Sequence, residues 1–160
     1  MTEKRSVWVS LLLSVLPVAV VGLLAALLVV TNSAWYLALN KPAINPPPWV
    51  FMVVWSVIYV CDAIALFLLA RQNADLGYGP VSVLILTGLL NIAWTGIFFR
   101  LHALLPAAAI LAALDAALIY LFFAFLPKNK ASAYLFLPNI AWGLFALVLN
   151  IAFVAQNINF

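Results

Sequence analysis

The sequence predicts an all-α membrane protein, a bundle of five transmembrane helices that forms one domain over residues 1–160. Of its 160 residues, 69% are hydrophobic and only 7% are charged, and a soluble globule of this composition could not cover its surface with polar groups. Apolar runs also recur with lengths near the roughly 20 residues that span a bilayer. The five expected spans are residues 7–30, 47–69, 81–99, 104–126 and 133–155.

The first span, residues 7–30, is too long for the core of a signal peptide and has no convincing small-residue cleavage site after it. We therefore expect it to stay in the protein, with a kink at Pro17 and Gly22. The connection that follows, residues 32–46, is expected to form a lid. Its Trp35, Tyr36 and Leu37 are too apolar for a solvated loop, so they either fold onto the helix ends or belong to an aromatic belt at the membrane interface.

Prolines and small residues mark the remaining elements. The second span opens with Pro47 and Pro48, which suit the first turn of a helix because they need no backbone donor there. Residues 72–80 are expected to form a turn because they contain two glycines and a proline, and residues 127–131 a short basic turn. The fourth span is rich in alanine, which lets helix backbones approach closely in lipid.

Charge placement predicts the orientation. Cytoplasmic loops of membrane proteins carry an excess of Lys and Arg, and the two sides of this chain differ in that respect. The N-terminal side holds Lys4, Arg5, Arg71, Lys128 and Lys130, and the other side holds Lys41 and Arg100. We therefore expect a bacterial inner-membrane protein with its N-terminus in the cytoplasm and its C-terminus outside. The topology accounts for the net charge of +3, and no basic stripe or stacking platform indicates a nucleic-acid partner.

Aromatic and amide side chains recur at helical spacing in three spans. The stripes comprise Phe51, Trp55, Tyr59 and Asp62; Asn91, Trp94 and Phe98; and Trp142, Phe145, Ala146, Leu149 and Asn150. At about 1.5 Å per residue from the outer helix ends, members of all three stripes lie in the same half of the membrane, namely Trp55, Asn91, Trp94, Phe145 and Asn150. They predict either a cavity for a large, flat, mostly apolar ligand, with Trp35 and Trp49 above it, or rings that simply fill the core.

The same residues resemble those of the translocator protein family, also called tryptophan-rich sensory proteins (TspO). The resemblance covers about residues 35 to 155 and depends on a set of short matches in order. They are Trp35-Tyr36, Lys41-Pro42, Pro47 to Phe51, Trp55, Tyr59, Asn91, Trp94, Phe98-Phe99, Pro138, Ala141-Trp142, Phe145-Ala146 and Leu149-Asn150.

The resemblance implies a five-helix protein, often a homodimer, that binds porphyrin or haem as its ligand and holds no covalent cofactor and no metal of its own. It also implies a ligand pocket lined at Trp49, Asn91, Trp94, Trp142, Phe145, Ala146 and Asn150. The implied roles are transport, sensing or light-dependent breakdown of the porphyrin, the last with participation of Trp49 and Trp142. Sterol binding is not expected, because Ile151, Ala152 and Phe153 stand where animal members carry an aromatic and then a basic residue.

The polar and charged residues bear on three other classes of function, namely an enzyme, an exporter and a structural subunit. No nucleophile with a base and no phosphate-binding glycine loop indicates a conventional enzyme. Asp62 and Asp115 lie within spans, where a carboxylate is costly, so they either serve a small proton-coupled exporter or are hydrogen-bonded between helices. The first span has no acidic residue, unlike that of small multidrug exporters. A structural subunit of a membrane complex is a third class, and His102 is either a ligand of haem iron or a solvated loop residue.

Overall fold

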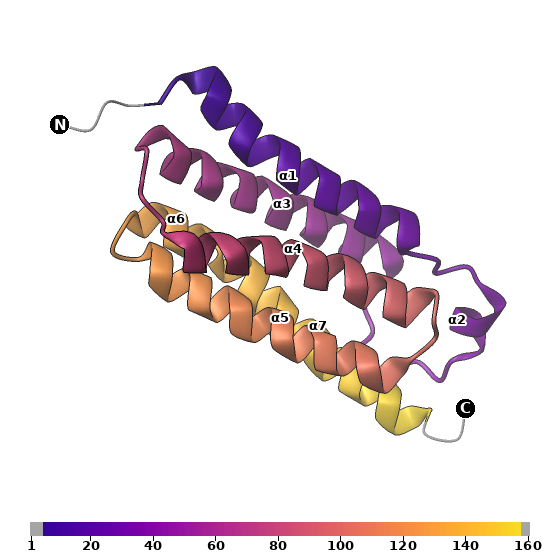
Figure 1. The fold of residues 1–160 in the computed structure, drawn as a ribbon. Helices are drawn as coiled ribbons and strands as arrows, with labels where there is room; N and C mark the ends of the chain where they lie inside the picture. Colours follow the sequence, from indigo (N-terminus) through magenta and orange to yellow (C-terminus); the bar gives the residue numbers. More distant parts are fainter. Residues whose placement is uncertain (1–4, 158–160) are drawn as a thin grey trace.

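The computed structural model describes residues 5–157, and every regular element in that range is an α-helix (Figure 1). Five of its helical stretches are long and apolar enough to cross a membrane, which confirms the predicted fold class. They are α1 (Val7–Leu28), α3 (Pro48–Arg71), α4 (Tyr78–Phe99), α5 (Leu104–Phe125) and the stretch Lys130–Gln156. A short helix, α2 (Ala34–Ala38), lies in the connection between α1 and α3.

The last stretch is two helices and not the single one expected over residues 133–155. Helix α6 (Lys130–Leu135) ends before Phe136, and α7 (Leu137–Gln156) begins directly after it. Pro138 lies in the first turn of α7, and proline has no N–H to donate to the carbonyl of the preceding turn. A new helix therefore begins just before Pro138, so that the proline occupies a first-turn position, where a backbone N–H would have no partner within the helix.

Helix α4 begins earlier than expected. The predicted turn over residues 72–80 ends at Gly77, whose φ of 69° only glycine adopts readily and whose N–H donates to Asp75 Oδ1 at 3.0 Å. Tyr78, Gly79 and Pro80 already belong to α4, because a proline is tolerated in the first turn of a helix. Helix α3 likewise begins at Pro48, in agreement with its run of prolines.

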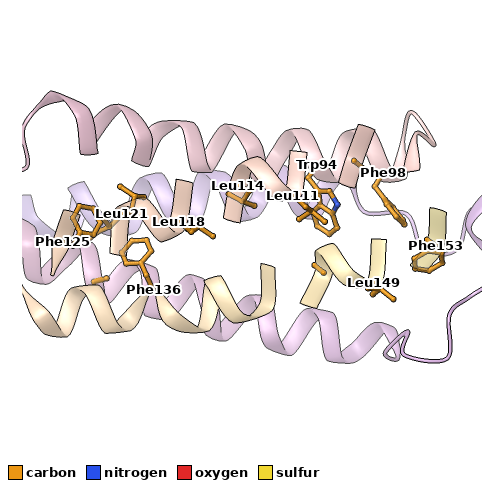
Figure 2. Packing of buried hydrophobic residues seen from close by; sticks show 14 of the residues in the cluster. Trp94, Phe98, Leu111, Leu114, Leu118, Leu121, Phe125, Phe136, Leu149 and Phe153 are labelled. Carbon is orange, nitrogen blue, oxygen red and sulfur yellow. The ribbon is translucent and has the colours of Figure 1, made fainter. Parts of the chain in front are cut away.

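More buried side chains come from α5, α7 and α4 than from the other helices. On α5, Leu111, Leu114, Leu118 and Leu121 are at most 2% exposed, and Figure 2 shows them between the neighbouring helices. Helices α1 and α3 pack against each other at the other side of the bundle (Figure 1). The outer surface of α1 is almost entirely apolar and exposed, as expected of a helix in contact with lipid.

The connection between α1 and α3 folds onto the helix ends, as one of the two expectations had it. Ser33 caps α2 by accepting the N–H of Tyr36 at 3.2 Å. Tyr36 and Leu39 are buried, and the Tyr36 ring packs near Phe153 of α7 with 6.4 Å between ring centroids. Leu37 is an exception, since it is 62% exposed. We call this connection, residues 32–46, the lid.

Candidate ligand cavity

A cavity of about 430 Å³ lies beneath the lid, between α1, α3, α4 and α7. Most of the residues singled out from helical spacing line it, and they come from three helices that are far apart in the sequence. These lining residues are Trp49, Phe51, Trp55, Tyr59, Asn91, Trp94, Phe98, Ala146 and Asn150. The described structure therefore brings together one surface that the sequence distributes over 102 positions, from 49 to 150.

Three aromatic contacts make the cavity wall continuous. The Trp55 ring lies 5.5 Å from the Tyr59 ring and 6.3 Å from the Trp94 ring, with interplanar angles of 30° and 32°. Phe98 extends the row, with its centroid 6.2 Å from that of Trp94. Centroid separations of about 4.5–7 Å are typical of favourable aromatic pairs. The wall thus offers ring faces and edges over most of its area.

A small set of hydrogen bonds connects the helices around the cavity. The Tyr59 hydroxyl donates to Asn91 Oδ1 at 3.3 Å, which joins α3 to α4. Trp94 Nε1 donates to Asn150 Oδ1 at 3.3 Å, and Asn150 Nδ2 donates to the Leu104 carbonyl at 2.8 Å. Asn150 is only 2% exposed, so it links α4, α5 and α7 from inside the bundle.

The lining carries no formal charge. Among the described residues that face the cavity there is no Asp, Glu, Lys, Arg or His. Its polar groups are amides, hydroxyls and an indole N–H, with Asn45 and Thr31 near the lid and Thr95 deeper on α4. A few neutral polar groups within an apolar wall are typical of sites that orient a mostly apolar ligand.

Three of the predicted site residues lie outside the lining. Trp142 packs edge-on against Phe51, with centroids 5.4 Å apart, and next to Phe145 at 5.0 Å. Phe51 lines the cavity on the side where it contacts Trp142, whereas neither Trp142 nor Phe145 lines it. Trp35 lies on the lid, edge-on to Phe98 at 5.8 Å. These rings form a second layer, and contact of any of them with a ligand stays a prediction.

His102 belongs to the turn between α4 and α5 and does not line the cavity. Its ring stacks on that of Trp35 at 4.2 Å with an interplanar angle of 13°. Its φ of 57° is uncommon for a residue other than glycine. The side chain is exposed at the lid, which fits the expectation of a solvated loop residue, and the stack adds a contact that the sequence did not reveal.

Hydrogen bonds hold the lid to the end of α7, and others tie the end of α4 to the end of α1. The Asn40 N–H donates to Asn157 Oδ1 at 2.9 Å, and Asn157 Nδ2 donates back to the Asn40 carbonyl at 3.0 Å. Arg100 donates to the carbonyls of Leu27 and Leu28 at the end of α1. Tyr36 is a buried residue of the lid itself, and burial raises the pKa of its hydroxyl.

Helix α1 contributes to the cavity, which the sequence did not predict. Gly22, Ala25 and Ala26 line it, and Gly22 has a specific reason to be small. A Cβ at this position would lie 3.0 Å from Cε2 of Tyr59, so the tyrosine ring packs directly on the backbone of α1. The only signal for this contact was the spacing of small residues, which lets helices approach closely in lipid.

The two intramembrane carboxylates lie away from the cavity. Asp62 was expected to share the cavity-facing stripe of Trp55, but it turns to α7, where Asn139 Nδ2 donates to its Oδ2 at 2.8 Å. The expected hydrogen bond between helices is thus confirmed for Asp62. The same expectation is wrong for Asp115. This residue is 3% exposed, contacts Gly143 of α7 and has no hydrogen-bond partner among residues 5–157.

Five apolar spans around a lidded, aromatic cavity define the class of the protein, which is a small integral membrane protein with an internal pocket in one half of its helix bundle. The profile of the TspO/MBR family matches residues 13–155. The chain therefore belongs to the TspO/MBR family.

Three relatives are similar to the chain over most of its length. The tryptophan-rich protein TspO of Archaeoglobus fulgidus is 32% identical over 149 residues, which cover 92% of this chain and 96% of the relative. The protein CrtK of Rhodobacter capsulatus is 34% identical over 73% of this chain and 74% of its own length. The tryptophan-rich sensory protein of Cereibacter sphaeroides is 30% identical over 78% and 77%.

Proposed function

We propose that the protein binds a flat, largely apolar tetrapyrrole of the porphyrin or haem type in the cavity beneath the lid. The observation that carries the proposal is the continuous wall of rings from Tyr59 through Trp55 and Trp94 to Phe98. Large planar ligands gain most from such a wall, because aromatic pairs contribute about 0.5–1.5 kcal/mol beyond their area burial. The cavity volume of about 430 Å³ also lies in the range of small-molecule sites.

The absence of charge in the described lining constrains how such a ligand binds. Burying an ionised carboxylate without a partner is strongly unfavourable, so the propionate groups of a porphyrin stay at the lid while the macrocycle occupies the cavity. Lys41 on the lid and Arg100 at the end of α4 are both exposed on that side. The amides of Asn91 and Asn150 then face the apolar part of the ring.

We also propose that the lid lies on the outer side of the membrane. Arg71, Lys128 and Lys130 lie at the opposite end of the bundle from the lid (Figure 1), and such an excess of basic residues is typical of the cytoplasmic side. In a Cys61→Ala background, an impermeant maleimide added to intact cells should label cysteine at Ala43 of the lid and not at Lys128. The reverse labelling pattern would overturn the orientation.

Titration of the detergent-solubilised protein with protoporphyrin in the dark tests the binding proposal. Soret absorption and tryptophan fluorescence should report saturable, stoichiometric binding. Trp55→Ala should weaken it roughly twofold to tenfold, the equivalent of one lost aromatic pair. Trp8→Ala is the matched control, since Trp8 is 76% exposed on α1 and lies outside the cavity, and its affinity should equal that of the parent.

Two outcomes would contradict the proposal, namely no saturable binding, or equal effects of the Trp55 and Trp8 substitutions. Transport, sensing and breakdown all need the same pocket, so illumination forms a second arm of the experiment. Bleaching of the bound Soret band that depends on the protein would indicate light-dependent breakdown. A stable band under light would favour transport or sensing.

A further inference from the structure

A groove of about 600 Å³ lies on the lipid-facing side of the bundle, between α1 and α3. We call it the side groove. Its own walls are Val15, Ala19 and Leu23 on α1 and Ser56, Val60 and Ala63 on α3, and most of these side chains are exposed. The groove lies along the middle of two spans, α1 and α3, and its walls are apolar. In a membrane it therefore faces lipid chains and not water.

The side groove and the cavity meet along the contact between α1 and α3. Five residues line both spaces, namely Gly22, Ala26, Met52, Trp55 and Tyr59. The partition between the two spaces is thus one layer of side chains thick. Its main parts are the ring of Tyr59, which packs on Gly22 of α1, and the neighbouring ring of Trp55.

We propose that this partition is a lateral portal, through which the apolar ligand passes between the bilayer and the cavity without crossing the lid. The proposal rests on the proposed function, since it concerns the route of the same ligand. It commits the side groove to one occupant, the tetrapyrrole in transit, because the groove shares five lining residues with the cavity and has similarly apolar walls.

The bonding around the two possible routes favours the portal. Opening the lid breaks the reciprocal bonds between Asn40 and Asn157 and also the stack of Trp35 on His102. Within residues 5–157, hydrogen bonds tie α1 to the other helices only near its two ends, where Arg71 of α3 donates to the Arg5 carbonyl and Arg100 donates to the carbonyls of Leu27 and Leu28. Between those ends no hydrogen bond joins the described residues of α1 to α3, and apolar helix contacts in a bilayer exchange for lipid contacts of equal polarity, so parting the middle of α1 from α3 costs only packing.

Tyr59 is the side chain whose movement would open the portal. Its ring closes the partition against Gly22, and its hydroxyl is held by one long hydrogen bond of 3.3 Å to Asn91 Oδ1. A bond at that distance lies beyond the usual range and is weak. A rotation of this one ring, with its neighbour Trp55, connects the groove to the cavity.

Exchange kinetics of protoporphyrin with the protein in lipid nanodiscs test the route. Ala19→Phe and Ser56→Phe place a ring in the side groove from each wall. Both should slow association and dissociation together, by about tenfold if the ring adds roughly 1.4 kcal/mol to the barrier, and leave the Kd unchanged. Val20→Phe and Val57→Phe are matched controls at the same depth outside the groove, and their rates should equal those of the parent.

The outcomes separate the route from the function. Equal rates in groove variants and controls would overturn the portal, and so would a raised Kd with unchanged association, which would make the groove part of the binding site. Asn157→Ala, which loosens the lid, should leave both rates unchanged, and faster exchange in that variant would assign the route to the lid. Failure of the parent to bind in the equilibrium titration would instead overturn the proposed function.

Discussion

The bond between Trp94 and Asn150 offers a quantitative test of how the cavity is built. Trp94 Nε1 donates to Asn150 Oδ1 at 3.3 Å, and the two residues are 7% and 2% exposed. Asn150→Ala removes the acceptor and leaves the indole N–H buried without a partner, which costs about 1–3 kcal/mol. Trp94→Phe removes the donor, so Asn150→Ala should cost less in that background.

The double-mutant cycle isolates this one bond, because the loss of the second bond, from Asn150 Nδ2 to the Leu104 carbonyl, is common to both backgrounds. Hydrogen bonds between membrane helices average about 0.6 kcal/mol in such cycles and reach about 1.7. We expect a coupling energy near that average and not near the maximum, because the pair is buried but its donor–acceptor distance of 3.3 Å is long. Unfolding in mixed micelles at increasing SDS, followed by far-UV circular dichroism, gives the four free energies. A coupling of zero within about 0.3 kcal/mol would refute the reasoning.

Three further predictions follow from the same structure. Gly143→Ala should destabilise the protein by about 1–3 kcal/mol through overpacking, because its Cβ would overlap the carboxylate of Asp115, and Asp115→Ala should restore much of the loss in the same unfolding assay. Asp62→Asn should fold and bind protoporphyrin like the parent with an affinity that does not change from pH 6 to 8, because Asp62 faces Asn139 and not the cavity. A large loss of affinity, or a steep pH dependence abolished by the substitution, would instead support the proton-coupled exporter. The dimethyl ester of protoporphyrin should still bind, because the described lining holds no cation with which the propionates could pair, and a complete loss of binding with the ester would show that ionic pairing, and not the wall of rings, carries the affinity.

The spans could be predicted because the bilayer sets their length and composition. The apolar runs ended within a few residues of the observed helices. The errors arose where proline was ambiguous. The sequence pattern assigns Pro80 to a turn, but Pro80 lies in the first turn of α4. The pattern also predicts one continuous last helix across Pro138, where the structure begins a new helix.

The cavity could be predicted only in part, because helical spacing gives the direction of a side chain and not its neighbour. It correctly placed Trp55, Tyr59 and Trp94 on one wall. It could not show that Phe51 packs against Trp142, or that Asp62 finds a partner on α7.

Helix α1 was missed for a different reason. Apart from Ser10 and Ser14, which are both buried, it carries no polar side chain, so hydrophobic periodicity does not mark its inward face near the cavity. Only the packing of Gly22 on Tyr59 shows which side of α1 meets the cavity.

The central claim is that a porphyrin binds among the rings beneath the lid, and the tryptophans themselves can report its position. The chain has 6 tryptophans, so protein labelled with 5-fluorotryptophan should give resolvable ¹⁹F resonances. The ring current of a bound macrocycle changes the chemical shifts of nearby tryptophans. At saturation with protoporphyrin, the resonances of Trp49, Trp55 and Trp94 should shift most, because these three line the cavity. Trp8 should not shift, and a shift confined to Trp8, or none at saturation, would contradict the account.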